Sequence, residues 1–193
     1  MSRNPDRPRR SIPIVRGGLG ALLLAVALGV LTPNEASAQG GFFGAGVGPA
    51  IRIDDAPNQF RLELEIGYYV EGRPRGFFLS FAPAQSYGAD WWILTFPLRL
   101  GGVFDIVRNR DFTFQIGPTG TVGFAVSDRF DSPRDPDPWF HFSFGLALRF
   151  LVLQEKLAFY LRPVDFEFFI GDTNPFGNEM IRYVLVGGVQ FYF

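Results

Sequence analysis

The residue types with the clearest catalytic potential lie together near position 142. His141 and Ser143 are separated by one residue, and this spacing places a base and a nucleophile on the same face of a β-strand. If the segments on either side of position 154 form a hairpin, Glu167 lies roughly opposite His141 and Asp165 lies opposite Ser143. This arrangement would bring a nucleophile, a base and an orienting carboxylate into one patch, as in a hydrolase triad.

The sequence offers little for metal, cofactor or nucleic-acid chemistry. It contains no cysteine and a single histidine, which excludes thiol catalysis, disulfides, cysteine-based zinc sites and multi-histidine metal sites. The net charge of −1 gives no reason to expect a nucleic-acid partner. Residues 127–138 could bind Ca²⁺ or Mg²⁺, but they lack the spaced ligands of a calcium-binding loop and are interpreted as a solvated loop; their aspartates are Asp128, Asp131, Asp135 and Asp137. We therefore expect no metal and no cofactor.

Residues 1–38 have the three-part pattern of a secretory signal peptide. Five arginines form a basic region, residues 17–31 are apolar, and Ala36-Ser37-Ala38 provides a cleavage site before Gln39. The apolar run has 15 residues, fewer than the roughly 20 that a spanning helix needs. A retained anchor or a buried helix fits this pattern less well. We predict a signal peptide over residues 1–38 and one domain over residues 39–193.

Period-two alternation of apolar and polar residues dominates the rest of the chain. In residues 60–70 one face is charged or small and the other is wholly apolar, consisting of Phe60, Leu62, Leu64, Ile66, Tyr68 and Val70. The same pattern, clear or weaker, predicts further strands in residues 42–53, 76–83, 92–101, 112–126, 140–150, 157–170 and 181–193. No run reaches the 18 apolar residues of a spanning helix. Eight segments of this size, separated by turns, are typical of an all-β, eight-stranded antiparallel transmembrane β-barrel.

The segment 157–170 changes phase part-way along. Its apolar residues stand at odd positions up to Leu161 and at even positions from Val164 onwards. One extra residue in a strand produces such a change, so we expect a β-bulge at Arg162 and Pro163.

The connections differ in charge at the two ends of the predicted strands. Those after the second, fourth and sixth strands are basic and contain Arg73, Arg75, Arg108, Arg110 and Lys156. Those after the odd-numbered strands are mostly longer and acidic. With both termini in the periplasm, the longer connections lie outside the cell, as barrels of this kind prefer.

Alternation alone does not decide which face is wet. A secreted barrel of the lipocalin type would hold the phenylalanine-rich face inside. That face exceeds what the inside of an eight-stranded barrel can hold, and the opposite face of residues 113–125 is uncharged and small. Aromatic residues also cluster at strand ends, as in the girdles at membrane interfaces; these are Tyr68, Trp91, Trp92, Trp139 and Tyr183. We therefore expect the apolar face to contact lipid.

The last strand carries a recognisable ending. Its alternate positions are mostly apolar and end in a phenylalanine; they are Tyr183, Leu185, Gly187, Val189, Phe191 and Phe193. This ending resembles the C-terminal strand signal of outer-membrane β-barrel proteins, which implies recognition by the barrel assembly machinery. With the signal peptide, residues 39–193 resemble the small OmpA-like and OmpX-like eight-stranded barrels in pattern and length, although no motif fixes a subfamily.

In this register nine charged residues face inward: Arg52, Arg61, Glu63, Glu65, Arg99, Arg149, Asp165, Glu167 and Arg182. Buried charges persist only when they are paired and hydrogen-bonded, so we expect a salt-bridged, non-conducting interior. The strand that follows Glu63 and Glu65 brings no charge, so their partners must come from across the interior. Arg99 and Arg149 are the candidates.

The same register points His141 and Ser143 inward. The His-x-Ser pattern also resembles the outer-membrane lipid A deacylases, but that family continues with Asn where this chain has Phe144. A lipid-cleaving pair must also face the bilayer. We therefore interpret His141 as a histidine satisfied by an interior carboxylate and expect no enzymatic activity.

Taken together, these patterns predict an outer-membrane β-barrel protein of a Gram-negative bacterium. It would contact outer-membrane lipid and lipopolysaccharide and have a structural or interaction role in the envelope. Two alternatives stay open: a lipid A-modifying hydrolase that uses His141, Ser143 and Glu167, and a narrow pore.

Overall fold

The computed structural model describes residues 40–53, 58–89, 91–129, 138–171 and 179–193. The predicted signal peptide and most of the aspartate-rich loop lie outside these residues, and both stay predictions. The strands are β1 (Gly41–Arg52), β2 (Gln59–Tyr69), β3 (Gly76–Phe81), β4 (Ala84–Tyr87), β5 (Trp91–Arg108), β6 (Thr113–Arg129), β7 (Pro138–Val152), β8 (Leu157–Ile170), β9 (Glu179–Val184) and β10 (Val186–Tyr192). Within the described ranges, no helix is long and apolar enough to cross a membrane.

Two pairs of these strands are halves of single strands. β3 and β4 both pair with β2 and with β5, and are separated only by Ala82 and Pro83. β9 and β10 both pair with β1 and β8, and are separated by Leu185, whose N–H donates to the carbonyl of Pro49 in β1. Proline has no N–H, so Pro83 and Pro49 each remove a ladder hydrogen bond where pairing is interrupted. The predicted eight-stranded antiparallel architecture is confirmed.

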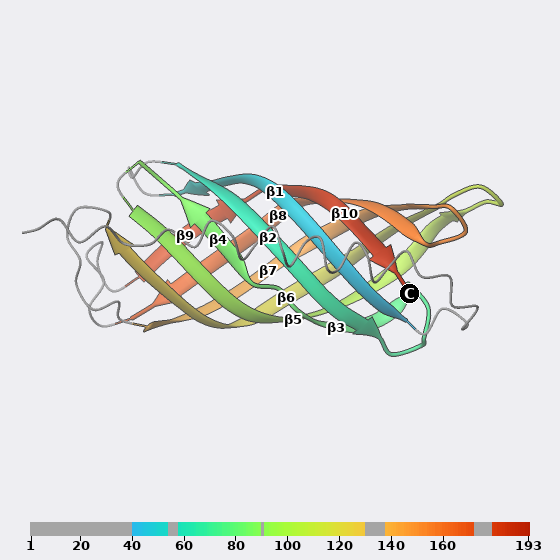
Figure 1. Ribbon diagram of the computed structural model, residues 1–193, viewed down its shortest axis with the longest axis horizontal. Helices are drawn as coiled ribbons and strands as arrows, with labels where there is room; N and C mark the ends of the chain where they lie inside the picture. The colour runs from blue at the N-terminus through green and yellow to red at the C-terminus, as the bar shows by residue number, and fades with distance from the viewer. Residues whose placement is uncertain (1–39, 54–57, 90, 130–137, 172–178) are drawn as a thin grey trace, which may run out of the picture. The chain divides into compact units, whose positions relative to one another are not determined.

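The strands form a closed ring (Figure 1). β1 pairs with β2 on one side and with β9 and β10 on the other. Following hydrogen-bonded partners once around the ring from Phe42 leads back to β1 at Arg52, ten residues further along. A ring with this stagger requires strands tilted by about 35–45° from its axis, and Figure 1 shows the oblique strands.

The predicted bulge in β8 is present. Leu146 of β7 pairs with Val164, but Leu148, two residues further on, pairs with Leu161. Arg162 and Pro163 thus share one position opposite Ala147, and the faces of β8 exchange there as the phase change predicted. A second bulge, at Ile106 in β5, had no such signal in the sequence.

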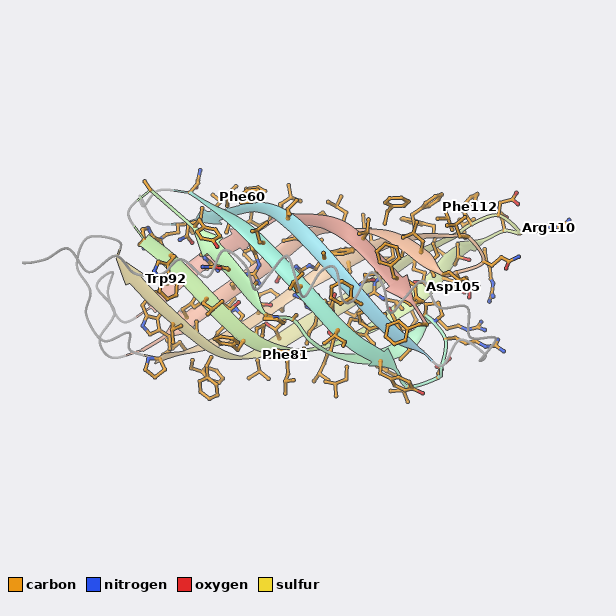
Figure 2. All side chains as sticks on the ribbon, in the orientation of Figure 1. Phe60, Phe81, Trp92, Asp105, Arg110 and Phe112 are labelled. Atoms are coloured by element: carbon orange, nitrogen blue, oxygen red, sulfur yellow. The ribbon has the colours of Figure 1, made fainter. Side chains whose placement is uncertain are left out.

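The phenylalanine-rich face lies outside the ring. Phe60 is 51% exposed and Phe124 is 62% exposed, and Figure 2 shows Phe60 and Phe81 pointing away from the strands. The lipocalin-like alternative required these side chains to fill the middle, so the structure excludes it.

Two of the predicted girdle residues are placed differently. Trp91 and Trp139 are buried inside the ring, where they pack with Ile93, Phe169 and Met180. The prediction was wrong because it considered only their position at strand ends. The alternation along each strand places Trp91 on the same inner face as Ile93, and Trp139 on the same inner face as His141. Tyr68, by contrast, lies on the outer face.

Candidate functional site: the charged interior of the barrel

All nine predicted inward-facing charged residues are buried, each at most 5% exposed. Their strands alternate an apolar outer position with a polar inner one, so the closed ring gathers the inner positions around one axis. The interior also contains Arg162, which is 2% exposed.

Glu63 is the centre of the interior network. Its carboxylate accepts two hydrogen bonds from Arg99, Nη1 to Oε1 at 2.9 Å and Nη2 to Oε2 at 3.1 Å. Arg162 donates to the same carboxylate at 2.6 Å, and Arg61 donates at 3.2 Å. These arginines come from β5, β8 and β2, so one carboxylate joins three parts of the wall. The predicted partnership of Glu63 with Arg99 is present.

Glu65 has a different set of partners. Ser80 donates to it at 2.6 Å, Gln190 donates at 2.9 Å, and Arg99 lies at 3.2 Å. Arg149, the other candidate partner, forms no ion pair with Glu63 or Glu65. Its guanidinium instead lies over the rings of Phe78, at 4.7 Å, and Tyr69, at 5.5 Å. The prediction for Arg149 was wrong because that side chain lies nearer the turn end of the barrel, level with aromatic residues.

A second group of charges lies nearer the opposite end. Arg182 Nη2 donates to Glu167 at 2.5 Å, and Arg61 Nη1 lies 2.8 Å from the other oxygen of that carboxylate. Asp165 accepts from Arg162 Nη1 at 2.8 Å. Because Arg61 and Arg162 each contact carboxylates of both groups, the charges form one continuous network.

The buried charges are unequal in number. Among the described residues, the interior holds six arginines and four carboxylates: Arg52, Arg61, Arg99, Arg149, Arg162 and Arg182, and Glu63, Glu65, Asp165 and Glu167. Arg61, Arg99, Arg162 and Arg182 pair with the carboxylates, and three of the six arginines lie over aromatic rings, among them Arg182 over Phe169 at 4.7 Å. Arg149 lies over Phe78 and Tyr69, and Arg52 lies 5.5 Å from the Trp91 ring centre. Cation–π contacts are favourable where the cation is desolvated, as at these buried positions.

Apolar clusters lie on both sides of the charged network. The turn-end cluster contains Phe42, Tyr69, Phe78, Val103, Leu151, Ala158 and Tyr192. The loop-end cluster contains Trp91, Ile93, Ala125, Trp139, Phe169 and Met180. These large side chains fill the ring above and below the ion pairs. Sequence reasoning did not predict these clusters, because it traced only the charged inner positions.

The hydrolase triad does not assemble. Ser143 pairs with Glu167 along the strands, whereas His141 pairs with Phe169, so the expected register was wrong. The turn, which sets Val152 opposite Leu157, accounts for one residue of the difference, and the extra residue at the β8 bulge accounts for the second. Ser143 Oγ accepts a hydrogen bond from Thr121 at 2.8 Å, and His141 Nε2 lies 3.4 Å from Glu167, which is long for a hydrogen bond.

His141 nevertheless lies beside an interior carboxylate, as interpreted from the sequence. It is fully buried and its ring packs against Phe169 at 4.8 Å. Both His141 and Ser143 face the interior, so neither reaches a lipid in the bilayer. No group of metal-ligating residues occurs in the described part of the chain.

Comparisons with known proteins agree with the fold. No protein-family model and no curated protein matches the chain. Among solved structures, Neisserial surface protein A aligns over 79% of this chain and 97% of its own, with 10% identity and a TM-score of 0.54. The attachment invasion locus protein Ail of Yersinia pestis aligns over 79% and 99%, with 15% identity and a TM-score of 0.43. The chain folds as a small eight-stranded outer-membrane β-barrel.

Arg162 is the interior charge of this outer-membrane β-barrel fold that sequence reasoning missed. The phase change in residues 157–170 contained the necessary signal. Applied to each half of β8 separately, the alternation places Arg162 inside with the first half and Asp165 inside with the second. A single phase for the whole strand would have placed one of them on the outer wall.

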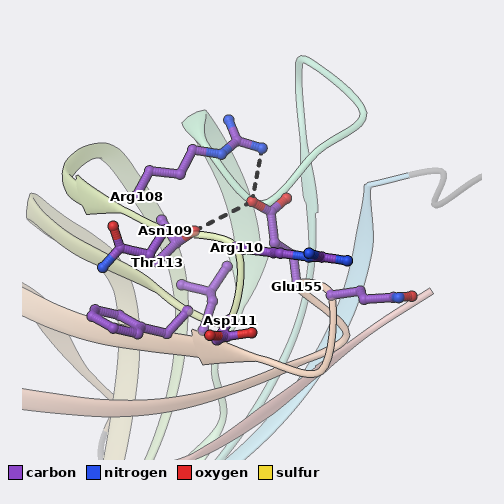
Figure 3. Close-up of a pocket in the computed structure, with 9 residues that line it drawn as sticks. Arg108, Asn109, Arg110, Asp111, Thr113 and Glu155 are labelled. Atoms are coloured by element: carbon purple, nitrogen blue, oxygen red, sulfur yellow. Dashed lines mark hydrogen bonds and ion pairs between the residues drawn. The ribbon is translucent and has the colours of Figure 1, made fainter.

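The turn end of the β-barrel has a small polar pocket of about 280 Å³ between the β5–β6 and β7–β8 hairpins (Figure 3). Arg108 Nη2 lies 3.0 Å from Glu155, and Thr113 lies 3.5 Å from the same carboxylate. Arg108 is half exposed, so this ion pair adds little stability. The pocket contains an ion pair that links two turns.

Proposed function

We propose that this chain is an outer-membrane protein of a Gram-negative bacterium, with a structural or interaction role in the envelope and a sealed, non-conducting interior. The observation that carries the proposal is the distribution of polarity across the wall. A continuous apolar surface covers the outside, including Ile66, Leu98 and Phe124, while the paired charges are inside. A soluble protein rarely exposes a contiguous apolar patch of more than a few hundred Å², whereas a membrane barrel requires an apolar band about 25 Å tall.

The proposal of a sealed interior is supported by what fills the ring. Each carboxylate of the network lies within hydrogen-bond reach of an arginine, and an aromatic or aliphatic cluster closes either side. A narrow pore would need a water path through both clusters. A charged side chain that opened such a path would also have to break its ion pairs with partners that are buried beside it, which is costly.

The exposed ends of the strands are proposed as the interaction surface. The acidic and mostly longer connections of the sequence follow β1, β4, β6 and β8, and all of these strands end opposite Gly41 and Phe193. With the termini in the periplasm, this end faces outward. The barrel then acts as a rigid anchor that presents loops to the cell surface.

Assembly through the last strand is part of the same proposal. Phe193 is 54% exposed at the end of the chain, and its backbone N–H donates to Gly41 at 2.9 Å. The strand that carries the terminal phenylalanine thus also closes the ring against β1. We propose that the barrel assembly machinery recognises it before closure, and that lipid and lipopolysaccharide surround the closed barrel.

Electrophoresis of purified outer-membrane fractions tests the location and the fold together. The unboiled protein should migrate faster than the boiled protein, because a closed barrel resists unfolding by detergent. Recovery of the processed protein in the soluble periplasmic fraction would contradict the proposal. A planar bilayer containing the folded protein should show no conductance steps, and reproducible steps would establish the pore instead.

A further inference from the structure

A hollow of about 610 Å³ interrupts the outer wall near the turn end. It lies over β3, β5 and β6, and its lining includes Val70, Phe77, Leu79, Leu100, Gly102 and Gly120. The volume falls within the range of small-molecule sites, roughly 300–1,000 Å³. The hollow is unusual for a lipid-facing wall because large apolar side chains surround positions that carry no side chain at all.

The two glycines are not required by the packing of the wall. A Cβ on Gly120 would have its nearest neighbour at 3.6 Å, and one on Gly102 would have its nearest at 3.5 Å; both are ordinary contacts. At the inward-facing Gly123 a Cβ would lie 2.4 Å from the Phe96 carbonyl oxygen, so glycine is needed there. The rings of Phe77 and Phe104 lie over Gly102, whereas no side chain lies within 4 Å of a Cβ on Gly120, so the absence of a side chain at position 120 contributes most to the hollow.

Positive charge lies at the foot of the hollow. Val70 and Phe77 line the hollow at its end nearest the β2–β3 turn, and the Val70 N–H donates to the Phe77 carbonyl at 2.9 Å. Residues 71–75 connect them and contain Glu71 and Arg73, which are exposed, and Arg75, which is half-buried, so the connection has a net charge of +1. Neither guanidinium forms an ion pair within the described part of the chain. Since strands turn here at the periplasmic end, these arginines lie at headgroup height when the apolar lining lies at acyl-chain height.

We propose that the hollow binds an anionic glycerophospholipid of the periplasmic leaflet. One acyl chain fills the space over Gly120, beside Phe77 and Leu100, and the phosphate lies beside Arg73 and Arg75. The inference rests on the proposed membrane location and adds a ligand to it. An acyl chain fits because it is narrow, flexible and apolar, whereas the wall of a second barrel is convex and cannot enter a concave site. The match of apolar lining to acyl chain and of arginine to phosphate selects this class of lipid.

The test uses the full mature barrel folded in vesicles of equal dioleoyl phosphatidylglycerol and dioleoyl phosphatidylcholine. After extraction into mild detergent, native mass spectrometry counts the retained lipids. The wild type should retain phosphatidylglycerol with about a fivefold or greater preference, the factor expected for one arginine near an anionic headgroup. Gly120→Leu fills the hollow and should reduce retention at least about fivefold.

Gly187→Leu is the matched control, because Gly187 lies on the outer face of β10 with its nearest neighbours 3.8 Å from a Cβ. It should retain lipid like the wild type. The double variant Arg73→Gln, Arg75→Gln should still retain lipid but lose the preference for phosphatidylglycerol. The heat-dependent mobility shift verifies that every variant is folded.

Equal retention by Gly120→Leu and Gly187→Leu would overturn the lipid site, as would equal retention of the two lipids by the wild type. A dimer that disappears in Gly120→Leu would assign the hollow to a second copy and also overturn it. Failure of the folded wild type to enter vesicles would contradict the proposed function instead. Insertion without retained lipid would contradict only this inference.

Discussion

Arg99 and Glu63 face each other across the interior of the barrel and share two parallel hydrogen bonds, of 2.9 and 3.1 Å. They belong to β5 and β2, which β3 and β4 separate in the ring. The pair therefore ties together strands that have no backbone hydrogen bonds in common. Glu63 also accepts from Arg61 and Arg162, so one carboxylate bridges three guanidinium groups, and Glu65, Asp165 and Glu167 supply the further negative charge that pairs with them.

Glu63→Gln should lower the free energy of unfolding by about 3–5 kcal/mol, because it leaves buried guanidinium groups without their counter-charge. Urea titration of the folded fraction in vesicles, read by electrophoretic mobility, measures the change. Arg149→Met is the matched control: it removes a buried charge that has no carboxylate partner in the network. Its cost should be at most about 2 kcal/mol, the loss of a cation–π contact. Equal costs for the two variants would show that the interior pairs do not stabilise the barrel.

Deleting Pro163 should prevent folding, whereas Pro163→Ala should not. The extra residue in β8 lets Arg162 and Asp165 both face the interior, three positions apart. Without it, one half of β8 must turn its charges toward lipid, since a slip of one residue exchanges the two faces. Pro163→Ala keeps the extra residue and the backbone carbonyl that accepts from the Tyr183 hydroxyl. The heat-dependent mobility shift distinguishes the variants, and a shift in the deletion variant would show that the bulge is dispensable.

The sequence was sufficient for the fold and for most of the interior because both follow from alternation. Eight strands, the outward phenylalanines and nine buried charges all come from one period-two pattern and the limited space inside the ring. It was insufficient for the partners, because pairing across the interior depends on height along the barrel axis. That height depends on the stagger of the strands and on bulges. For this reason sequence reasoning paired Arg149 with carboxylates that lie at another height, and it placed Glu167 opposite His141, whereas Glu167 lies opposite Ser143. Arg162 was missed for a different reason, because the alternation was not applied to each half of the bulged strand separately.

Glycines on the two faces of β6 should respond differently to the same substitution. A Cβ on Gly117, which faces inward, would lie within bonding distance of the Gly102 carbonyl oxygen in β5, and the backbone cannot move away without breaking the ladder. Gly117→Ala should therefore abolish the heat-dependent mobility shift or leave a barrel destabilised by several kcal/mol, as for overpacking and strain. Gly120→Ala, on the outer face of the same strand, should cost less than about 1 kcal/mol. Similar stability of the two variants would contradict the inward placement of Gly117.

Ser143→Ala should leave the acylation of lipid A unchanged, because Ser143 faces the interior and its hydroxyl is bonded to Thr121 and not to His141. Its effect should be on stability alone, about 0.5–1.5 kcal/mol from the lost hydrogen bond and the unsatisfied Thr121 hydroxyl. The double variant Thr121→Val, Ser143→Ala removes both hydroxyls and should recover part of that loss. Mass spectrometry of lipid A from cells expressing the wild type or Ser143→Ala provides the decisive comparison. Loss of an acyl chain with the wild type, restored by Ser143→Ala, would establish the hydrolase and require His141 and Ser143 to turn outward.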